Sequence, residues 1–425
     1  MSKKQIYWLA IASILSLSII AYLIISKIPH QPKKGAGSPV IMPFKLELIA
    51  SFPWDDSIMR EPIFKFGLGT DQGEKKIRKV PILFLAPDGA FWILSAHGQL
   101  ARWLGGQWIG IDTSKSDIEN IVSIAPIANG EFLLLGQKGS NNILARLRNN
   151  GDLVWRREGV IDYQNLKLPL LQGNFDSIIS DTDGNVYLPG VRLNGEISRI
   201  NLTDGETPSS IDLGSYRAKI WIQMGKLYRV LKTDNSLREW IKRDIQFTKE
   251  ESINVAPSLE DALSSVCSPL PSGGALLCHR GKLVWMSPQG QPKHSIQIDG
   301  IVRNKDRLEI LDTGTMKLST WTGGTQVRHF AVPTEFRGVR LIAANLETYK
   351  LVVPASTPIP EHIISINVMS SESLEISRES VRNYDDLLRI EGVIDMNHPI
   401  VLSDDSILLV GADPQGGFIV RLTWV

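Results

Sequence analysis

Apolar and polar residues alternate in short runs along most of the chain, and the runs recur in a fixed order. The most regular run is a five-residue string with apolar residues at its second and fifth positions. It occurs eight times, as QLARW, ILARL, EISRI, SLREW, KLVWM, KLSTW, IISIN and FIVRL, and the fit is loosest at IISIN, whose fifth residue is Asn. From Leu100 in the first copy to Ile419 in the last, seven steps average about 46 residues. A period of this length predicts one supersecondary unit per copy.

Three further apolar runs accompany the string. The run just before it opens after Gly, Asn or Asp, as in AFWILS after PDG, and these residues supply the positive φ angles of tight hairpins. Another run lies ahead of that one, and a fourth follows the string in seven units, for example DLVWRR at 152–157. Each unit is therefore predicted to be a four-stranded antiparallel meander.

The two ends of the repeat region are unequal. The eighth unit ends at Val425 after its third strand, while the strand FKLELIASF at 44–52 precedes the first unit without a unit of its own. Pairing this strand with the last unit would remove both open edges. We therefore predict an all-β, eight-bladed β-propeller over residues 44–425, closed by its N-terminal strand, with seven blades as the alternative.

Two segments resemble known propeller families. GDLVWRR is similar to the tryptophan-containing strand of quinoprotein-like propellers, and DTDGNVYLPG resembles a signature of NHL and gluconolactonase-like propellers. The first resemblance implies a quinone cofactor beside two adjacent cysteines, but the two cysteines here are eleven residues apart. The second implies acidic and amide ligands in the central channel, where many first strands carry apolar or small residues instead. We expect neither a cofactor nor a metal.

A membrane anchor is predicted at the N-terminus. Residues 6–25 contain only three polar residues, all serines, and twenty apolar residues span the ~30 Å hydrocarbon core. A cleaved signal peptide is the alternative, although its apolar core is normally ~7–15 residues long. Residues 1–28 are assigned to a transmembrane signal anchor, and residues 29–43, with four Pro and two Gly, to a tether.

The orientation follows from the short head of the chain. Lysines lie on both sides of the span, so the charge rule nearly ties, but five residues are a poor candidate for translocation. The body is predicted on the extracytoplasmic, periplasmic side of the cytoplasmic membrane. The first 43 residues hold five Lys and no acid, which leaves 41 basic and 45 acidic groups in the other 382. A body of net charge −4 gives no electrostatic basis for nucleic-acid binding.

Function is less directly encoded. The chain has no H-E-x-x-H, G-x-S-x-G or P-loop string. We expect a protein-interaction scaffold, assembly factor or structural subunit of an envelope complex, and we lean against an enzyme. The alternative is a propeller enzyme with a dispersed site, such as a lactonase-like hydrolase or a dehydrogenase. Carbohydrate binding is a minor alternative, because exposed tryptophan rings can stack on sugars. Trp103, Trp240 and Trp321 recur at the fifth string position, however, and a fixed position suits packing between blades better.

The cysteines and the long links are the candidate sites. Cys267 and Cys278 lie symmetrically about the turn PSGG, so they are predicted to face each other and form a disulfide if the body is exported. Four long links, 53–81, 158–176, 253–263 and 380–398, all join a fourth strand to the next first strand. They should share one face, where partner contacts are expected; tolerated insertions are the alternative. The candidate binding residues on this loop face are Trp54, Asp55, Arg60, Tyr163, Arg382, Tyr384, Asp385 and Arg389.

Overall fold

The computed structural model describes residues 44–67, 74–104, 106–159, 178–180, 185–189, 196–206, 209–212, 219–223, 226–232, 238–244, 250–254, 266–279, 281–289, 291–332, 339–344, 348–352, 362–370, 373–380, 392–396 and 398–425. Within those residues, no helix has the length and apolar character needed to span a membrane. The predicted anchor at 6–25 and tether at 29–43 lie outside them and stay predictions.

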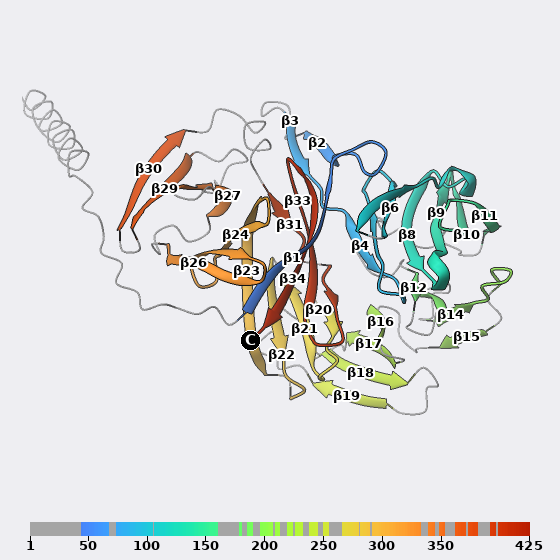
Figure 1. The fold of residues 1–425 in the computed structure, drawn as a ribbon. Helices are drawn as coiled ribbons and strands as arrows, with labels where there is room; N and C mark the ends of the chain where they lie inside the picture. Colours follow the sequence, from blue (N-terminus) through green and yellow to red (C-terminus); the bar gives the residue numbers. More distant parts are fainter. Residues whose placement is uncertain are drawn as a thin grey trace, which may run out of the picture.

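Four-stranded antiparallel meanders repeat along the first half of the described chain (Figure 1). The first two sheets contain β4 (Ile82–Leu85), β5 (Phe91–Leu94), β6 (Leu100–Leu104) and β7 (Gln107–Ile111), then β8 (Asn120–Pro126), β9 (Phe132–Lys138), β10 (Asn141–Leu147) and β11 (Leu153–Glu158). The next two contain β12 (Ile179–Ser180), β13 (Val186–Pro189), β14 (Glu196–Ile200) and β15 (Ser209–Asp212), then β16 (Lys219–Gln223), β17 (Lys226–Lys232), β18 (Arg238–Asp244) and β19 (Glu250–Asn254). The predicted strand order is confirmed in all four.

The next two units share one long strand. Their seven-stranded sheet contains β20 (Val266–Pro269), β21 (Ala275–His279), β22 (Lys282–Met286), β23 (Pro292–Asn304), β24 (Arg307–Asp312), β25 (Lys317–Thr322) and β26 (Thr325–Ala331). β23 pairs with β22 through its first half and with β24 through its second, with a β-bulge between Ile298 and Ile301. The fourth strand of one unit therefore continues directly into the first strand of the next.

The two ends of the repeat region meet in one sheet, as predicted. β1 (Phe44–Pro53) pairs antiparallel with β34 (Gly416–Trp424) along its whole length. β34 in turn pairs with β33 (Ile407–Asp413), and β33 pairs with two short strands. The remaining elements are β27 (Arg340–Ala344), β28 (Thr348–Val352), β29 (His362–Ser370) and β30 (Ser373–Ser380) in one sheet, the short strands β31 (Val393–Ile394) and β32 (Ile400–Val401), the hairpin β2 (Ile63–Gly67) and β3 (Glu74–Arg78), and the 3-10 turns η1 (Ser114–Ser116) and η2 (Ala128–Gly130).

All eight repeated strings lie on or overlap the third strand of a unit. These strands are β6, β10, β14, β18, β22, β25, β29 and β34. A repeat of four-stranded antiparallel sheets in meander order is the architecture of a β-propeller. The described residues contain no α-helix, so this part of the chain is all-β.

Contacts between sheets follow the chain order only in part. The first strands touch in the order β4, β8, β12, β16 and β20, but β20 then touches β32, and β32 touches β4. β27 packs instead against β23 and β24, and its sheet lies to one side of the molecule in Figure 1. The blade count predicted from the repeats stays a prediction, because the contact between β20 and β32 bypasses two units.

We call the sheet of β1, β34, β33, β31 and β32 the closing sheet. A large cluster of buried residues lies where it meets the seven-stranded sheet. Phe44 and Leu46 of β1 share one apolar cluster with Trp321 of β25 and Phe418 of β34. Trp321 is 2% exposed, and its ring stacks on Phe44 with the centroids 5.4 Å apart. The prediction that a tryptophan at this string position packs between sheets is confirmed at Trp321. Trp103 packs on Trp108 within its own sheet, and the side chain of Trp240 lies outside the described part.

The predicted register of the cysteine hairpin is wrong. Pro269 pairs with Ala275 and Val266 with Leu277, with a bulge in between, so Cys267 and Cys278 are not directly opposite. The cause is the turn, which closes between Leu270 and Gly274 and therefore holds three residues. Cys278 is buried and disulfide-bonded. Its pairing with Cys267, whose side chain is not described, stays a prediction.

Candidate functional site

The loop face begins where β1 ends. The indole Nε1 of Trp54 donates a hydrogen bond of 2.7 Å to the carbonyl oxygen of Asp413, and its ring meets Phe52 edge-on at 5.7 Å. Trp54 is therefore half-buried and fastens the end of β1 to the turn between β33 and β34. Of the predicted binding residues, this one has a structural role.

Asp55 and Arg60 bracket a tight turn. The Asp55 carbonyl accepts hydrogen bonds from the backbone of Ile58 and Met59, and Met59 is fully buried. The hydroxyl and then the backbone N–H of Ser57 donate to the Asp55 carboxylate, which lowers the pKa of this carboxyl. Arg60 is exposed and pairs with Asp56 at 2.9 Å. Asp55 and Arg60 are thus both exposed, whereas Trp54 is half-buried.

The other predicted binding residues lie outside the described part of the chain. They are Tyr163, Arg382, Tyr384, Asp385 and Arg389. Two of the long links proved to be partly regular: 53–81 contains the hairpin β2–β3, and 380–398 contains β31. Both were predicted as loops because their strands are short and lack the apolar alternation of the repeat.

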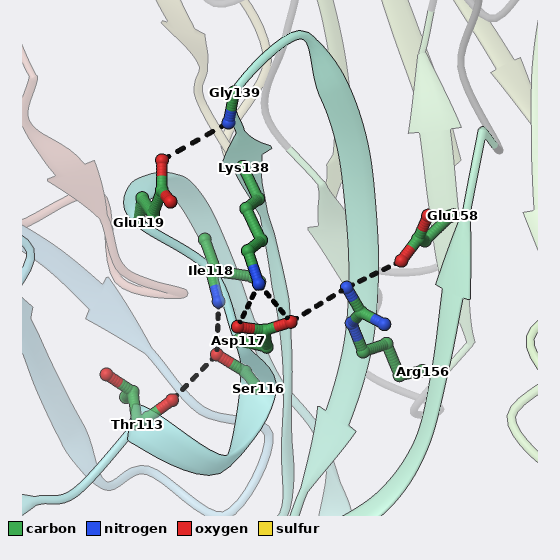
Figure 2. Close-up of polar contacts among 9 residues, drawn as sticks. All are labelled: Thr113, Ser116, Asp117, Ile118, Glu119, Lys138, Gly139, Arg156 and Glu158. Carbon is green, nitrogen blue, oxygen red and sulfur yellow. Dashed lines mark hydrogen bonds and ion pairs between the residues drawn. The ribbon is translucent and has the colours of Figure 1, made fainter.

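Two hydrogen bonds join a link to a hairpin turn. The backbone N–H of Arg60 donates to Gln99 Oε1 at 2.8 Å, joining the link after β1 to the turn between β5 and β6. The backbone N–H of Gly139 donates to Glu119 Oε2 at 3.2 Å, joining the link after β7 to the turn between β9 and β10 (Figure 2). At these two places, the links after β1 and β7 are therefore held to the neighbouring hairpins.

A network of charged side chains lies close to the second of these hydrogen bonds, the one between Gly139 and Glu119. In Figure 2, Asp117 lies between Lys138, at 2.6 Å, and Arg156, at 3.2 Å, and Arg156 also contacts Glu158 at 2.6 Å. The hydrogen bond from Lys138 is the main cause that lowers the pKa of Asp117. All four side chains are at least partly exposed, so the pairs order this rim and add little stability. Their charges are mutually satisfied.

A cavity of about 680 Å³ opens beside the closing sheet, and we call it the closure groove. It is lined by Phe44, Lys45, Glu47, Trp321, Gly323, Gly324, Thr325, Gln326, Arg421, Thr423 and Val425. These residues come from β1, from β34 and the residue after it, and from the β25–β26 hairpin. A Cβ placed on Gly324 would lie 3.7 Å from the Cβ of Glu47, which shows that this hairpin turn lies over β1.

The groove combines buried aromatic rings with unpaired charges. Lys45 and Glu47 lie two residues apart on the exposed face of β1, while Phe44 and Leu46 point into the core. Arg421 stands opposite Glu47 in the ladder, yet its guanidinium binds Asp404 and Ser406 instead. Within the described residues, the side chains of Lys45 and Glu47 have no hydrogen-bond or ion-pair partner.

Sequence reasoning missed the closure groove because it forms only when three distant segments meet. The available signal was the leftover N-terminal strand, which located β1 beside β34 but could not place the β25–β26 turn above it. Among the residues that the structure describes, no group of three His, Cys, Asp or Glu side chains is arranged to hold a metal ion.

Comparison with known proteins reaches only the level of the fold. Neither a protein-family model nor a curated protein sequence matches the chain. The chain is similar in structure to the WD40 domain of SCAP from fission yeast, with a TM-score of 0.36 and 9% identity over 90% of this chain and 98% of that chain. It is also similar to YCF48 bound to D1 peptide, at 0.33 and 13% over 78% and 100%. The WD40 β-propeller domain of Doa1 gives 0.27 and 9% over 71% and 91%. The propeller architecture described above rests on the sheets themselves.

Proposed function

We propose that this chain is a protein-interaction scaffold that holds an extended segment of a partner protein in the closure groove. The observation that carries the proposal is the pair of unpartnered, opposite charges, Lys45 and Glu47, in a cavity of about 680 Å³. This volume lies within the ~300–1,000 Å³ that is typical of ligand-binding pockets. A short stretch of polypeptide fits the groove.

The spacing of the two charges defines the partner. Residues i and i+2 of a strand point to the same side and lie ~6.6 Å apart along it. An extended peptide has the same repeat, so an acidic side chain can meet Lys45 while a basic side chain two positions away meets Glu47. The partner segment should therefore carry one acid and one base with a single residue between them.

The location of the scaffold is part of the proposal. We place the body on the extracytoplasmic side, in an envelope complex, anchored by residues 6–25 and tethered by residues 29–43. The apolar length of the anchor supports this placement, as does the disulfide-bonded state of Cys278, because disulfides persist mainly in oxidising compartments. The loop face, through Tyr163 and Tyr384, remains a second proposed contact surface.

A peptide-display selection tests the groove. We expect the wild-type chain to enrich random peptides that carry an acid and a base with one residue between them, in one fixed order. The exchanged variant Lys45→Glu with Glu47→Lys should enrich peptides with the reverse order, because the two attractions are reversed.

A matched control exchanges charges elsewhere. Lys305 and Asp306 are exposed in the turn between β23 and β24, and Lys305→Glu with Asp306→Lys should leave the selected peptides unchanged. If the wild type and the Lys45/Glu47 exchange enrich the same peptides, or neither enriches any, the groove is not the binding site.

A further inference from the structure

A buried carboxyl group lies at the joint between two sheets. Glu309, on β24, is 1% exposed, and its Oε2 accepts hydrogen bonds from the Thr320 hydroxyl and, at 3.2 Å, from the Tyr349 hydroxyl. The two hydroxyls are themselves 3.2 Å apart. Thr320 stands directly opposite Glu309 in the β24–β25 ladder, whereas Tyr349 belongs to β28 of the neighbouring sheet. The three side chains therefore form a polar contact from one sheet to the next.

This joint holds a sheet that lies at one side of the molecule. The sheet β27–β30 packs through β27 against β23 and β24 (Figure 1). Around the polar contact, Leu311, Leu318, Leu341 and Leu351 complete the apolar part of the joint. An interface of this kind can open without unfolding the rest of the molecule.

The charged and titratable groups around Glu309 lie on the strands that pack against it. Arg307 on the same strand has a guanidinium nitrogen 4.0 Å from Oε1, and Arg328 on β26 stands opposite Thr320 in the next ladder. On β28, Tyr349 contacts Glu309, and the next residue, Lys350, lies on the opposite face of the strand. β23 places Val302 opposite Glu309, and β27 contributes Leu341. The other face of β24, with Leu308 and Ile310, packs into the cluster that contains β1.

We propose that Glu309 makes the docking of the sheet β27–β30 sensitive to pH: the sheet is held firmly when the buried carboxyl is protonated and loosens when it is ionised. A neutral carboxyl suits the apolar joint, whereas an ionised one carries a charge into it. This inference does not depend on the function of the closure groove.

The electrostatics agree with this direction. Burial raises the pKa of Glu309 above its usual value near 4.5, and this effect outweighs the hydroxyl donors and the two arginines, which lower it. In the opened state the solvated carboxyl returns to its ordinary value. The docked state is therefore favoured most below that ordinary pKa, and the preference declines as pH rises through the raised one.

Hydrogen exchange of the full-length chain tests the proposal. Protection factors, corrected for the intrinsic exchange rate at each pH, would be measured from pH 4 to pH 8 for the wild type and Glu309→Gln. We expect equal protection in β27–β30 at pH 4. At pH 8 we expect the wild type to be about threefold or more less protected than Glu309→Gln in these strands alone.

Two further variants keep the test decisive. Glu375→Gln removes an exposed carboxyl from β30 and should behave like the wild type at every pH. Tyr349→Phe removes one donor to the carboxylate, which raises the Glu309 pKa further and should deepen the loss of protection at pH 8; this variant decides the matter if Glu309→Gln does not fold. Equal protection of the wild type and Glu309→Gln at pH 8, or a difference spread equally over β8–β11, would overturn the proposal.

Discussion

At the scale of single residues, the buried charges define the joints between sheets. Glu309 lies between two apolar residues of β24 and Arg303 lies near the end of β23, and both lie where a second sheet covers the strand. Alternation along one strand predicts which residues share a face, but it does not reveal what covers that face. Their burial could therefore not be predicted from the sequence, whereas that of Trp321, at a repeated apolar position, could.

The ion pair between Arg303 and Asp413 gives a prediction at this scale. The two side chains are 9% and 6% exposed, joined by bonds of 2.9 and 3.1 Å, and the guanidinium lies over the Phe418 ring. Arg303→Met leaves a buried carboxylate without its cation, so we expect a loss of about 3–5 kcal/mol in the free energy of unfolding. Denaturant titration measures it.

A second substitution separates charge from packing. Asp413 Oδ1 also accepts the backbone N–H groups of Gln415 and Gly416, and an asparagine at 413 keeps an oxygen for them. The double variant Arg303→Met with Asp413→Asn should therefore recover part of the loss. Losses that simply add would show that the buried charge is not the cause.

At the scale of elements, the sequence predicts strands better than their registers. The eight strings identify eight third strands because a repeated apolar pattern appears once per unit. The register predicted for Cys267 and Cys278 is wrong because the turn after Leu270 holds three residues and the strand before it has a bulge. Turn length and bulges depend on backbone angles that flanking apolar residues do not specify.

The bend in β23 gives the second prediction. Gly300 has a φ of +115°, and a Cβ there would lie 2.1 Å from the carbonyl oxygen of Leu341 on β27. Gly300→Ala should therefore destabilise the chain by about 2–4 kcal/mol and push β27 away from β23. Gly139, with a φ of +56° and open space around it, is the matched control, and Gly139→Ala should cost only about 1 kcal/mol. Equal losses would mean that backbone strain alone, and not the close approach to β27, explains the glycine.

At the scale of the whole molecule, the pairing of β1 with β34 links location to function. This pairing was predictable because one strand was surplus at the start of the repeats and one was missing at the end. The closure groove was not, because it also needs the β25–β26 turn. Since β1 follows the predicted tether directly, the groove should stand within ~60 Å of the membrane, the full reach of 18 extended residues. A partner held there would itself belong to the membrane or its near surface.

The last prediction concerns which side of the membrane the body occupies. Protease added to intact spheroplasts of an expressing bacterium should remove the body while cytoplasmic proteins survive, because the five-residue head stays inside. Changing Lys3 and Lys4 to Glu removes the positive charges that retain the head, so part of the body should become protected. The matched change of Lys33 and Lys34 to Glu removes charges on the other side of the span and should leave the body fully digestible. If the wild-type body resists the protease until the cells are lysed, the body faces the cytoplasm. The Cys278 disulfide would then need an explanation other than export, because it would lie in a reducing compartment.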